Sequence, residues 1–210
     1  MGEARRKMQK LRESLLWQAE SWCFSPSDWE TSLVDEILDI PIVHVPRMLR
    51  NQIDWMGMPS QRCHENAFWY EKNDPTNQTK AVTGWWFQGM EFILHSVVGC
   101  DRQYRCITPT DGNDDVIHFR PDPKIEWVSK DGHLAALRNG QEIGIGVRPF
   151  PKFTIAQNTL MLRRLLSGTK PRNASEFTSD EMKNLLDENL SYEERNLIFS
   201  LTTGISVPVY

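Results

Sequence analysis

The sequence predicts an α+β protein: an antiparallel sheet of about four to six strands, a packed cysteine-bearing helix, and helical N- and C-terminal segments. Two observations support this fold class. Apolar residues recur at helical spacing near both ends of the chain. The middle instead contains short runs of β-branched and aromatic residues separated by Gly, Asp, Asn and Pro, which is typical of a meander of strands.

The length and composition indicate one structural unit. The chain has 210 residues, of which 40% are hydrophobic and 25% are charged, as in ordinary globular proteins. This length allows one core with helical additions and is too short for two full domains. We therefore divide the unit into a helical N-terminal segment at 1–58, a helix-plus-sheet core at 59–150 and a helical C-terminal segment at 151–210.

Charge and cysteine content limit the classes of partner and compartment. The formal net charge is −4, so the chain as a whole lacks the basic field that nonspecific nucleic-acid binding needs. No apolar stretch reaches the ~20 residues of a membrane span, and the N-terminus lacks the apolar run of a signal peptide. Cysteines are few, so we expect a cytoplasmic protein with free thiols at Cys23, Cys63, Cys100 and Cys106.

The N-terminal segment is expected to be largely helical. Residues 3–22 combine apolar side chains at helical spacing with a basic first half, which predicts an amphipathic helix. The terminal helices could contact a protein partner, and the basic part an acidic partner or a membrane surface, although a solvated helix face is the ordinary explanation. A second helix is predicted at 29–38, an extended piece at 42–45 and a short helix at 48–56.

The core and the C-terminal segment continue with one helix, several strands and further helices. Residues 63–72 are predicted to form a helix that ends at the turn-forming residues 73–77. Asp131-Gly132 and Asn139-Gly140 predict tight turns around a further hairpin. The predicted strands are 81–87, 91–98, 104–108, 116–119 and 125–128. The predicted C-terminal helices are 155–167, 178–189 and 191–201, of which the second begins with a capping box.

Cys63 is the candidate nucleophile. It occupies the first turn of the predicted helix, where unpaired backbone N–H groups and the positive end of the helix dipole favour a thiolate over a thiol. The alternative is structural. Cys63 shares a helix face with Ala67 and Tyr70, so its sulfur could be a small buried apolar group.

His95 is the candidate base. It shares one face of a predicted strand with Ile93 and Val97, so its ring points where apolar side chains point. A lone strand histidine is usually structural. A cysteine at a helix start followed by a histidine on a sheet strand is, however, the layout of thiol acyl-transfer enzymes.

The sequence leaves the identity of the residue that would orient His95 open. A turn at 99–102 would place position 106 opposite His95, where a Cys-His enzyme has an Asp or Asn. That position holds Cys106, a poor substitute for a carboxylate. The alternatives are Thr108 through a slipped strand register, Asp111, Asp101 or a neighbouring amide.

Donors for the oxyanion of a tetrahedral intermediate are expected at the same helix start. The backbone N–H groups of the cysteine and of His64 are candidates, together with the side-chain amide of Gln61 or Asn66. Trp85 and Trp86 point to opposite faces of their strand, and one of them could line the groove beside the cysteine. Packing on both faces is the alternative for these rings.

These motifs resemble a known superfamily. Cys63-His64-Glu65-Asn66 near a helix start, His95 on a strand 32 residues later and a strand ending in Thr108-Pro109 resemble the papain-like and transglutaminase-like Cys-His enzymes. That superfamily includes peptidases, amidases, protein deamidases, transglutaminases and arylamine N-acetyltransferases. A longer string is similar to small uncharacterised bacterial proteins: Cys-His-x-Asn, Gly84-Trp85, His95-Ser96-Val97-Val98, Thr108-Pro109 and Phe119-x-Pro121-Asp122-Pro123.

The resemblance covers roughly residues 60–127 and implies a nucleophile at Cys63, a base at His95 and an orienting group at Cys106 or a neighbour. It implies a thiol-dependent hydrolase or acyltransferase that acts on an amide or ester carbonyl through a Cys63 thioester, without a cofactor. The substrate would be a peptide, a protein or a small amide. Hydrolysis or deamidation is favoured over acetyl transfer, because the glycines that precede the cysteine of the acetyltransferases are absent.

Two other classes stay open. Cys63, His64 and His95 could belong to a Zn²⁺ site, although no Cys-x-x-Cys or His-x-x-x-His spacing supports one. The other class is a catalytically silent interaction protein that keeps the thiol-enzyme fold. It is credible because no acid occupies the position expected opposite His95.

Overall fold

The computed structural model describes residues 2–101, 103–110, 115–144 and 146–204 of the chain. It combines helices with antiparallel sheets, so the predicted α+β class is confirmed. The helices are α1 (Gly2–Ser21), α2 (Asp28–Asp39), α3 (Arg50–Ile53), α4 (Cys63–Asn73), α5 (Pro151–Leu166), α6 (Pro171–Ser175), α7 (Ser179–Asn189) and α8 (Tyr192–Thr203), with a 3-10 helix η1 (Asp54–Met56). The strands are β1 (Val43–Pro46), β2 (Lys80–Gln88), β3 (Glu91–Cys100), β4 (Gln103–Arg105), β5 (Val116–Pro121), β6 (Ile125–Lys130), β7 (His133–Arg138), β8 (Gln141–Glu142) and β9 (Gly146–Val147).

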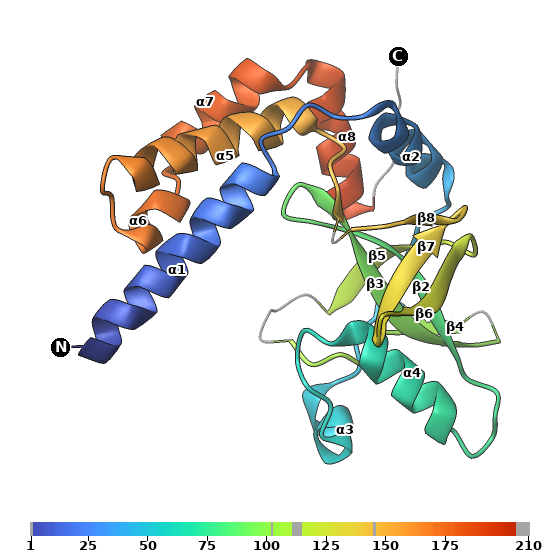
Figure 1. Cartoon of the computed structure of the whole chain (residues 1–210). Helices are drawn as coiled ribbons and strands as arrows, with labels where there is room; N and C mark the ends of the chain where they lie inside the picture. Colours follow the sequence, from blue (N-terminus) through green and yellow to red (C-terminus); the bar gives the residue numbers. More distant parts are fainter. Residues whose placement is uncertain (1, 102, 111–114, 145, 205–210) are drawn as a thin grey trace.

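Helices from the two ends of the chain pack together. α1 lies along α5 and α6, and Ala19 is fully buried among their apolar side chains (Figure 1). Thr178 and Glu181 form the capping box predicted for α7. α5 begins at Pro151 rather than at 155, because proline suits the first turn of a helix. Within the described residues, no helix is both long and apolar enough to cross a membrane.

The main sheet has the strand order β1-β5-β2-β3-β4, with β9 beside β3, and all these pairs are antiparallel. β2 and β3 form a long hairpin in which Gly84 lies opposite His95. On the other side of β2, the backbone of β5 approaches Gly84 so closely that only a glycine fits there. The close approach of β5 therefore fixes the position of β2, which pairs with the strand that carries His95.

A separate sheet is formed by β6, β7 and β8, in that order. The prediction of one continuous meander is wrong, because β5 pairs with β2 and β1 rather than with the preceding β4, and β6 to β8 then form a sheet of their own. Pro121 and Pro123 lack the N–H that a strand ladder needs, so the chain leaves the main sheet there. Asp122 accepts hydrogen bonds from Trp85 Nε1 at 2.9 Å and from Arg138 Nε at 2.7 Å, which ties the two sheets together.

Tight turns join the strands of the second sheet where the sequence predicts them. Asp131-Gly132 connects β6 to β7, and Asn139-Gly140 connects β7 to β8. All four residues have positive φ values, between 50° and 81°. This backbone is the one that two-residue hairpin loops require.

α4 packs on the main sheet, across β2 and β3 (Figure 1). Ala67 is fully buried there against Val98 and Ile107. The chain before α4 forms the short α3 and η1 instead of one helix over 48–56, and η1 ends at Gly57 in the left-handed region. α4 itself has nearly the predicted bounds.

Candidate active site

Cys63 is the first residue of α4, and its sulfur lies against β3. β9 pairs with the beginning of β3 and β4 with its end, so the outer edge between them, at 94–97, carries no strand among the described residues. The backbone N–H groups of Ser96, in this stretch, and of Cys63 and His64 lie near the sulfur and favour its charged form. Three backbone N–H groups therefore act on one partly buried side chain.

Burial nevertheless keeps Cys63 a thiol. Desolvation of the charged form raises the pKa of Cys63, and it outweighs the backbone donors, which act in the opposite direction. The expectation of a resting thiolate at this helix start is wrong for that reason. The sulfur needs a base before it can act as a nucleophile.

His95 is buried on β3, and its ring is neutral at neutral pH. Burial, followed by the charge of Arg47, lowers the pKa of His95 to about 3. Its Nε2 lies 3.3 Å from Cys106 Sγ, and the ring packs against Trp86 with 5.3 Å between centroids. The hydrogen bond of the ring thus goes to Cys106.

Cys106 reaches His95 by a route that the sequence does not predict. β4 pairs with β3 in a register that, if continued, would set Thr108 opposite His95. The predicted register is therefore wrong by two residues. After β4 the chain crosses to Arg47, with which Cys106 forms a parallel bridge. This crossing, and not the hairpin ladder, brings the Cys106 sulfur to the ring.

The other residues considered for orienting the base are dispersed. Thr108 lies at the pocket, and its hydroxyl accepts a hydrogen bond from Asn66 Nδ2 at 3.4 Å. Asn66 is buried and also donates to the Pro59 carbonyl at 2.9 Å, so its amide secures the start of α4. Asp101 is exposed and lines a different hollow. Asp111 lies outside the described residues.

His64 faces the opposite side of β3. Its Nδ1 lies 2.7 Å from Ser96 Oγ, which in turn lies 2.8 Å from Thr83 Oγ1. Trp127 Nε1 donates to the same threonine at 2.8 Å, and its ring lies 4.6 Å from that of His64. Burial lowers the pKa of His64 to about 4, so this ring is neutral as well. The network fastens α4 and the second sheet to the main sheet.

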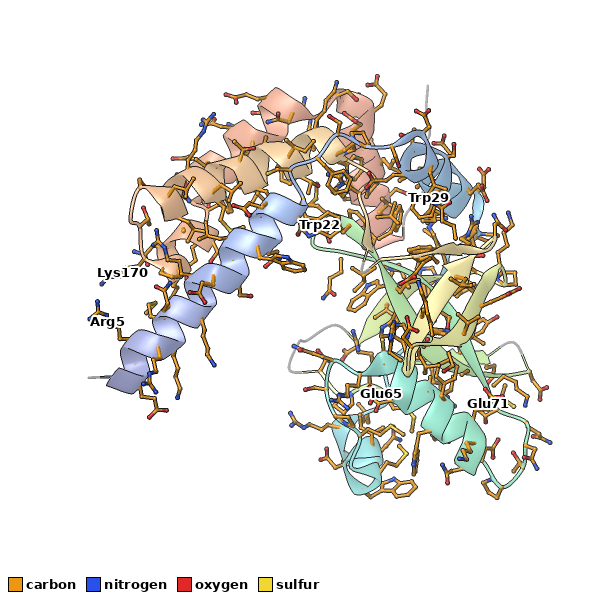
Figure 2. All side chains as sticks on the ribbon, in the orientation of Figure 1. Arg5, Trp22, Trp29, Glu65, Glu71 and Lys170 are labelled. Carbon is orange, nitrogen blue, oxygen red and sulfur yellow. The ribbon has the colours of Figure 1, made fainter. Side chains whose placement is uncertain are left out.

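A pocket of about 690 Å³ opens between the two sheets and the start of α4. In Figure 2, Glu65 and Glu71 mark α4, and side chains of both sheets lie beside it. The expected site residues that line the pocket are Gln61, Cys63, His64, Trp86, His95 and Thr108. Trp85 instead lies fully buried in the main core, because neighbours on a strand point to opposite faces.

Arg47 and Trp127 line the pocket although no motif singles them out. Arg47 follows β1, and its Nη1 lies 3.3 Å from Cys106 Sγ. Its guanidinium carbon lies 5.1 Å from the centre of the Trp86 ring. Trp127 comes from the second sheet. No spacing signal could have found either residue, because each reaches the site through the packing of a separate segment.

The zinc alternative finds no support in this arrangement. Within the described ranges, no group of three or more His, Cys, Asp or Glu side chains is placed to hold a metal ion. His64 contacts the side chain of Ser96, and the neighbouring His95 points to the other face of the strand. The two imidazoles line the same pocket but bond different partners, Ser96 and Cys106.

The resemblance to Cys-His enzymes is one of short motifs and layout. No protein-family model matches the sequence, and neither a curated protein nor a solved structure matches it.

Proposed function

We propose that this chain is a thiol-dependent hydrolase or acyltransferase that acts on an amide or ester carbonyl through a Cys63 thioester. One observation carries the proposal: Cys63, with backbone N–H groups near its sulfur, lines the same pocket as the buried imidazole of His95. Acyl transfer requires a nucleophile, a base and oxyanion donors. All three kinds of group are available in this pocket.

Both reacting groups are neutral at rest, so the thiol proton moves as the carbonyl is attacked. The proton passes to His95 while the sulfur–carbon bond forms, and the carbonyl oxygen becomes an oxyanion. The N–H groups near the sulfur, of Cys63, His64 and Ser96, are the donors that we propose for that oxyanion. The leaving group takes the proton from His95, and water or an amine then resolves the thioester.

In this mechanism Cys106 is a positioning residue that sets the tautomer of His95. Nε2 lies 3.3 Å from the Cys106 sulfur, and in this mechanism it carries the ring proton and donates it to that sulfur, so that Nδ1 acts as the base. Sulfur is a weaker acceptor than a carboxylate, and a neutral thiol brings no charge to stabilise an imidazolium. We therefore expect a slower enzyme than one with an acid at this position.

We further propose a substrate class, a cytoplasmic location and a protein partner. The rings of Trp86 and Trp127 beside polar groups suit a peptide, a protein side chain or a small amide. The cysteines of the described residues are free, which fits the reducing cytoplasm. Exposed apolar side chains on the terminal helices, such as Trp17 and Tyr192, leave room for a protein partner.

Acylation by 4-nitrophenyl acetate tests the thiol chemistry. We expect the wild type to release 4-nitrophenol and to carry one acetyl group on the Cys63 peptide, and Cys63→Ala to carry none there. His95→Gln should slow this acylation about a hundredfold or more, because the thiol loses its base. Mass spectrometry of the peptides and the release of 4-nitrophenol measure both effects.

Cys23→Ala and Cys100→Ala are the matched controls, because neither residue lines the pocket. Both variants should acylate Cys63 as the wild type does. Acetyl groups spread equally over all cysteines, or an undiminished rate in His95→Gln, would contradict the proposal.

A non-catalytic interaction protein is the second candidate. Two observations favour it: His95 bonds a thiol where a carboxylate would stabilise its charged form, and burial raises the pKa of Cys63. In that case the pocket would still bind ligands, but no acetyl group would accumulate on Cys63.

A further inference from the structure

Arg47 brings a positive charge to the pocket, and none of the residues that the structure describes supplies an anion for it. Among the described residues no carboxylate forms an ion pair with Arg47, and its Nε is buried without a hydrogen-bond partner. The contacts of its guanidinium are the Cys106 sulfur at 3.3 Å and the Trp86 ring at 5.1 Å. A charged group with an unpaired buried N–H is costly, so the site is incomplete by itself.

The other titratable groups considered at the pocket do not neutralise Arg47. Glu142 lines the pocket, but its carboxylate lies 2.5 Å from Lys130 Nζ. The rings of His64 and His95 are neutral at neutral pH, because burial lowers their pKa values to about 4 and about 3. Among the pocket residues that the structure describes, none therefore neutralises the charge that Arg47 offers to a ligand.

The Cys106 sulfur does not supply the missing anion either. Burial raises the pKa of Cys106 and outweighs the opposing effect of Arg47, so the sulfur is a neutral thiol. This sulfur lies 3.3 Å from Arg47 Nη1 and 3.3 Å from His95 Nε2. A negative group bound at Arg47 would thus also lie close to the imidazole.

We propose that the substrate of this pocket carries a carboxylate that binds Arg47, an inference that rests on the proposed thiol chemistry. The planar guanidinium fork matches a carboxylate, with which it forms charge-assisted hydrogen bonds. The carboxylate would also take the place of the acid that other Cys-His sites hold beside the imidazole.

This arrangement makes the substrate part of the catalytic site. Arg47 disfavours a charged His95, and its effect on the ring is second only to that of burial. A substrate carboxylate that neutralises Arg47 removes this repulsion, so His95 accepts the proton of Cys63 more readily. A substrate without a carboxylate leaves the repulsion in place.

Alkylation of Cys63 by iodoacetate and by iodoacetamide tests the inference without requiring turnover. Each reagent forms a sulfur–carbon bond and releases iodide and the thiol proton, and the two differ mainly in charge. We expect the iodoacetate-to-iodoacetamide rate ratio at Cys63 to be about tenfold higher than at Cys23 and Cys100 at low salt. Quantitative mass spectrometry of the cysteine peptides measures the ratio.

Variants of two arginines locate the anion site. Arg47→Gln should remove the preference for iodoacetate, whereas Arg47→Lys should keep most of it because the charge is retained. Arg62→Gln is the matched control, because Arg62 directly precedes Cys63 but its exposed side chain binds Glu65 at 2.9 Å. The ratio should be unchanged in Arg62→Gln.

A protection experiment uses only the wild-type protein, so its result does not depend on whether a variant folds. Glutarate should slow the alkylation of Cys63 by iodoacetamide, and glutaramide should not. An unchanged ratio in Arg47→Gln, or equal protection by the two compounds, would overturn the inference even if Cys63 acylates normally. An Arg47-dependent ratio without any acetylation of Cys63 would support the anion site and refute the thiol chemistry.

Discussion

Arg148 shows how the protein satisfies a buried guanidinium when no ligand is involved. Its Nη2 and Nε bind the two carboxylate oxygens of Glu30 at 2.6 and 2.8 Å. Its Nη1 donates to the carbonyls of Trp22, marked in Figure 2, and Phe24. Every nitrogen of this side chain has a partner, in contrast to Arg47, whose Nε has none among the described residues.

Glu30→Gln should lower the free energy of unfolding by about 3–5 kcal/mol, because it leaves a buried guanidinium without its counter-charge. Urea unfolding at neutral pH measures the change. Glu176→Gln is the control, since it removes an exposed pair with Arg172 and should leave the stability almost unchanged. Equal effects of the two substitutions would show that the buried pair is not a major source of stability.

Among the secondary-structure elements, the contact between β2 and β5 fixes the sheet beneath His95. Gly84 on β2 lies opposite His95 on β3 and opposite Pro121 on β5. A Cβ at this position would lie 2.1 Å from the Arg120 carbonyl oxygen and 2.7 Å from Phe119 Cζ. Backbone cannot move out of the way as a flexible side chain can, so the strands would have to separate.

Gly84→Ala should destabilise the protein by about 1–3 kcal/mol, the usual cost of overpacking. Thermal unfolding measures it. Gly144→Ala is the matched control, because a Cβ there would meet no atom within 4 Å. Indistinguishable melting curves for the two variants would contradict the close approach of β5.

On the scale of the whole molecule, buried neutral histidines make folding sensitive to acid. The ordinary pKa of histidine is 6.5, whereas burial lowers it to about 4 for His64 and about 3 for His95 in the folded chain. When the pH lies between the ordinary pKa of 6.5 and these lowered values, the unfolded chain binds more protons than the folded chain. The free energy of unfolding therefore falls as the pH falls below 6.5.

We expect this loss to reach on the order of 3 kcal/mol for each of the two rings as the pH is lowered from neutrality toward 4. Urea unfolding across this range measures it. His95→Gln should show a shallower dependence, because one of the two buried rings is gone. The same slope in wild type and variant would show that His95 is not kept neutral by burial.

Local features of the chain were determined by the sequence itself. Helical periodicity located α1, α2 and α4, Thr178 and Glu181 located the start of α7, and Asp131-Gly132 located a hairpin turn. These features depend on interactions between residues close in the chain. The meander, by contrast, failed where β5 crossed to β2 and β1 instead of pairing with β4. After Pro121 and Pro123, which lack N–H donors, the chain left the main sheet for the second one.

The sequence predicted only part of the candidate site. The amino-acid sequence by itself determined the positions of Cys63 on a helix start and of His95 on a strand. Only the tertiary structure decided that Cys63 is a thiol, that Cys106 meets the imidazole, and that Arg47 lies in the same pocket. The reason is physical: desolvation and charge at a site depend on which distant segments pack around it, and no local pattern specifies that packing.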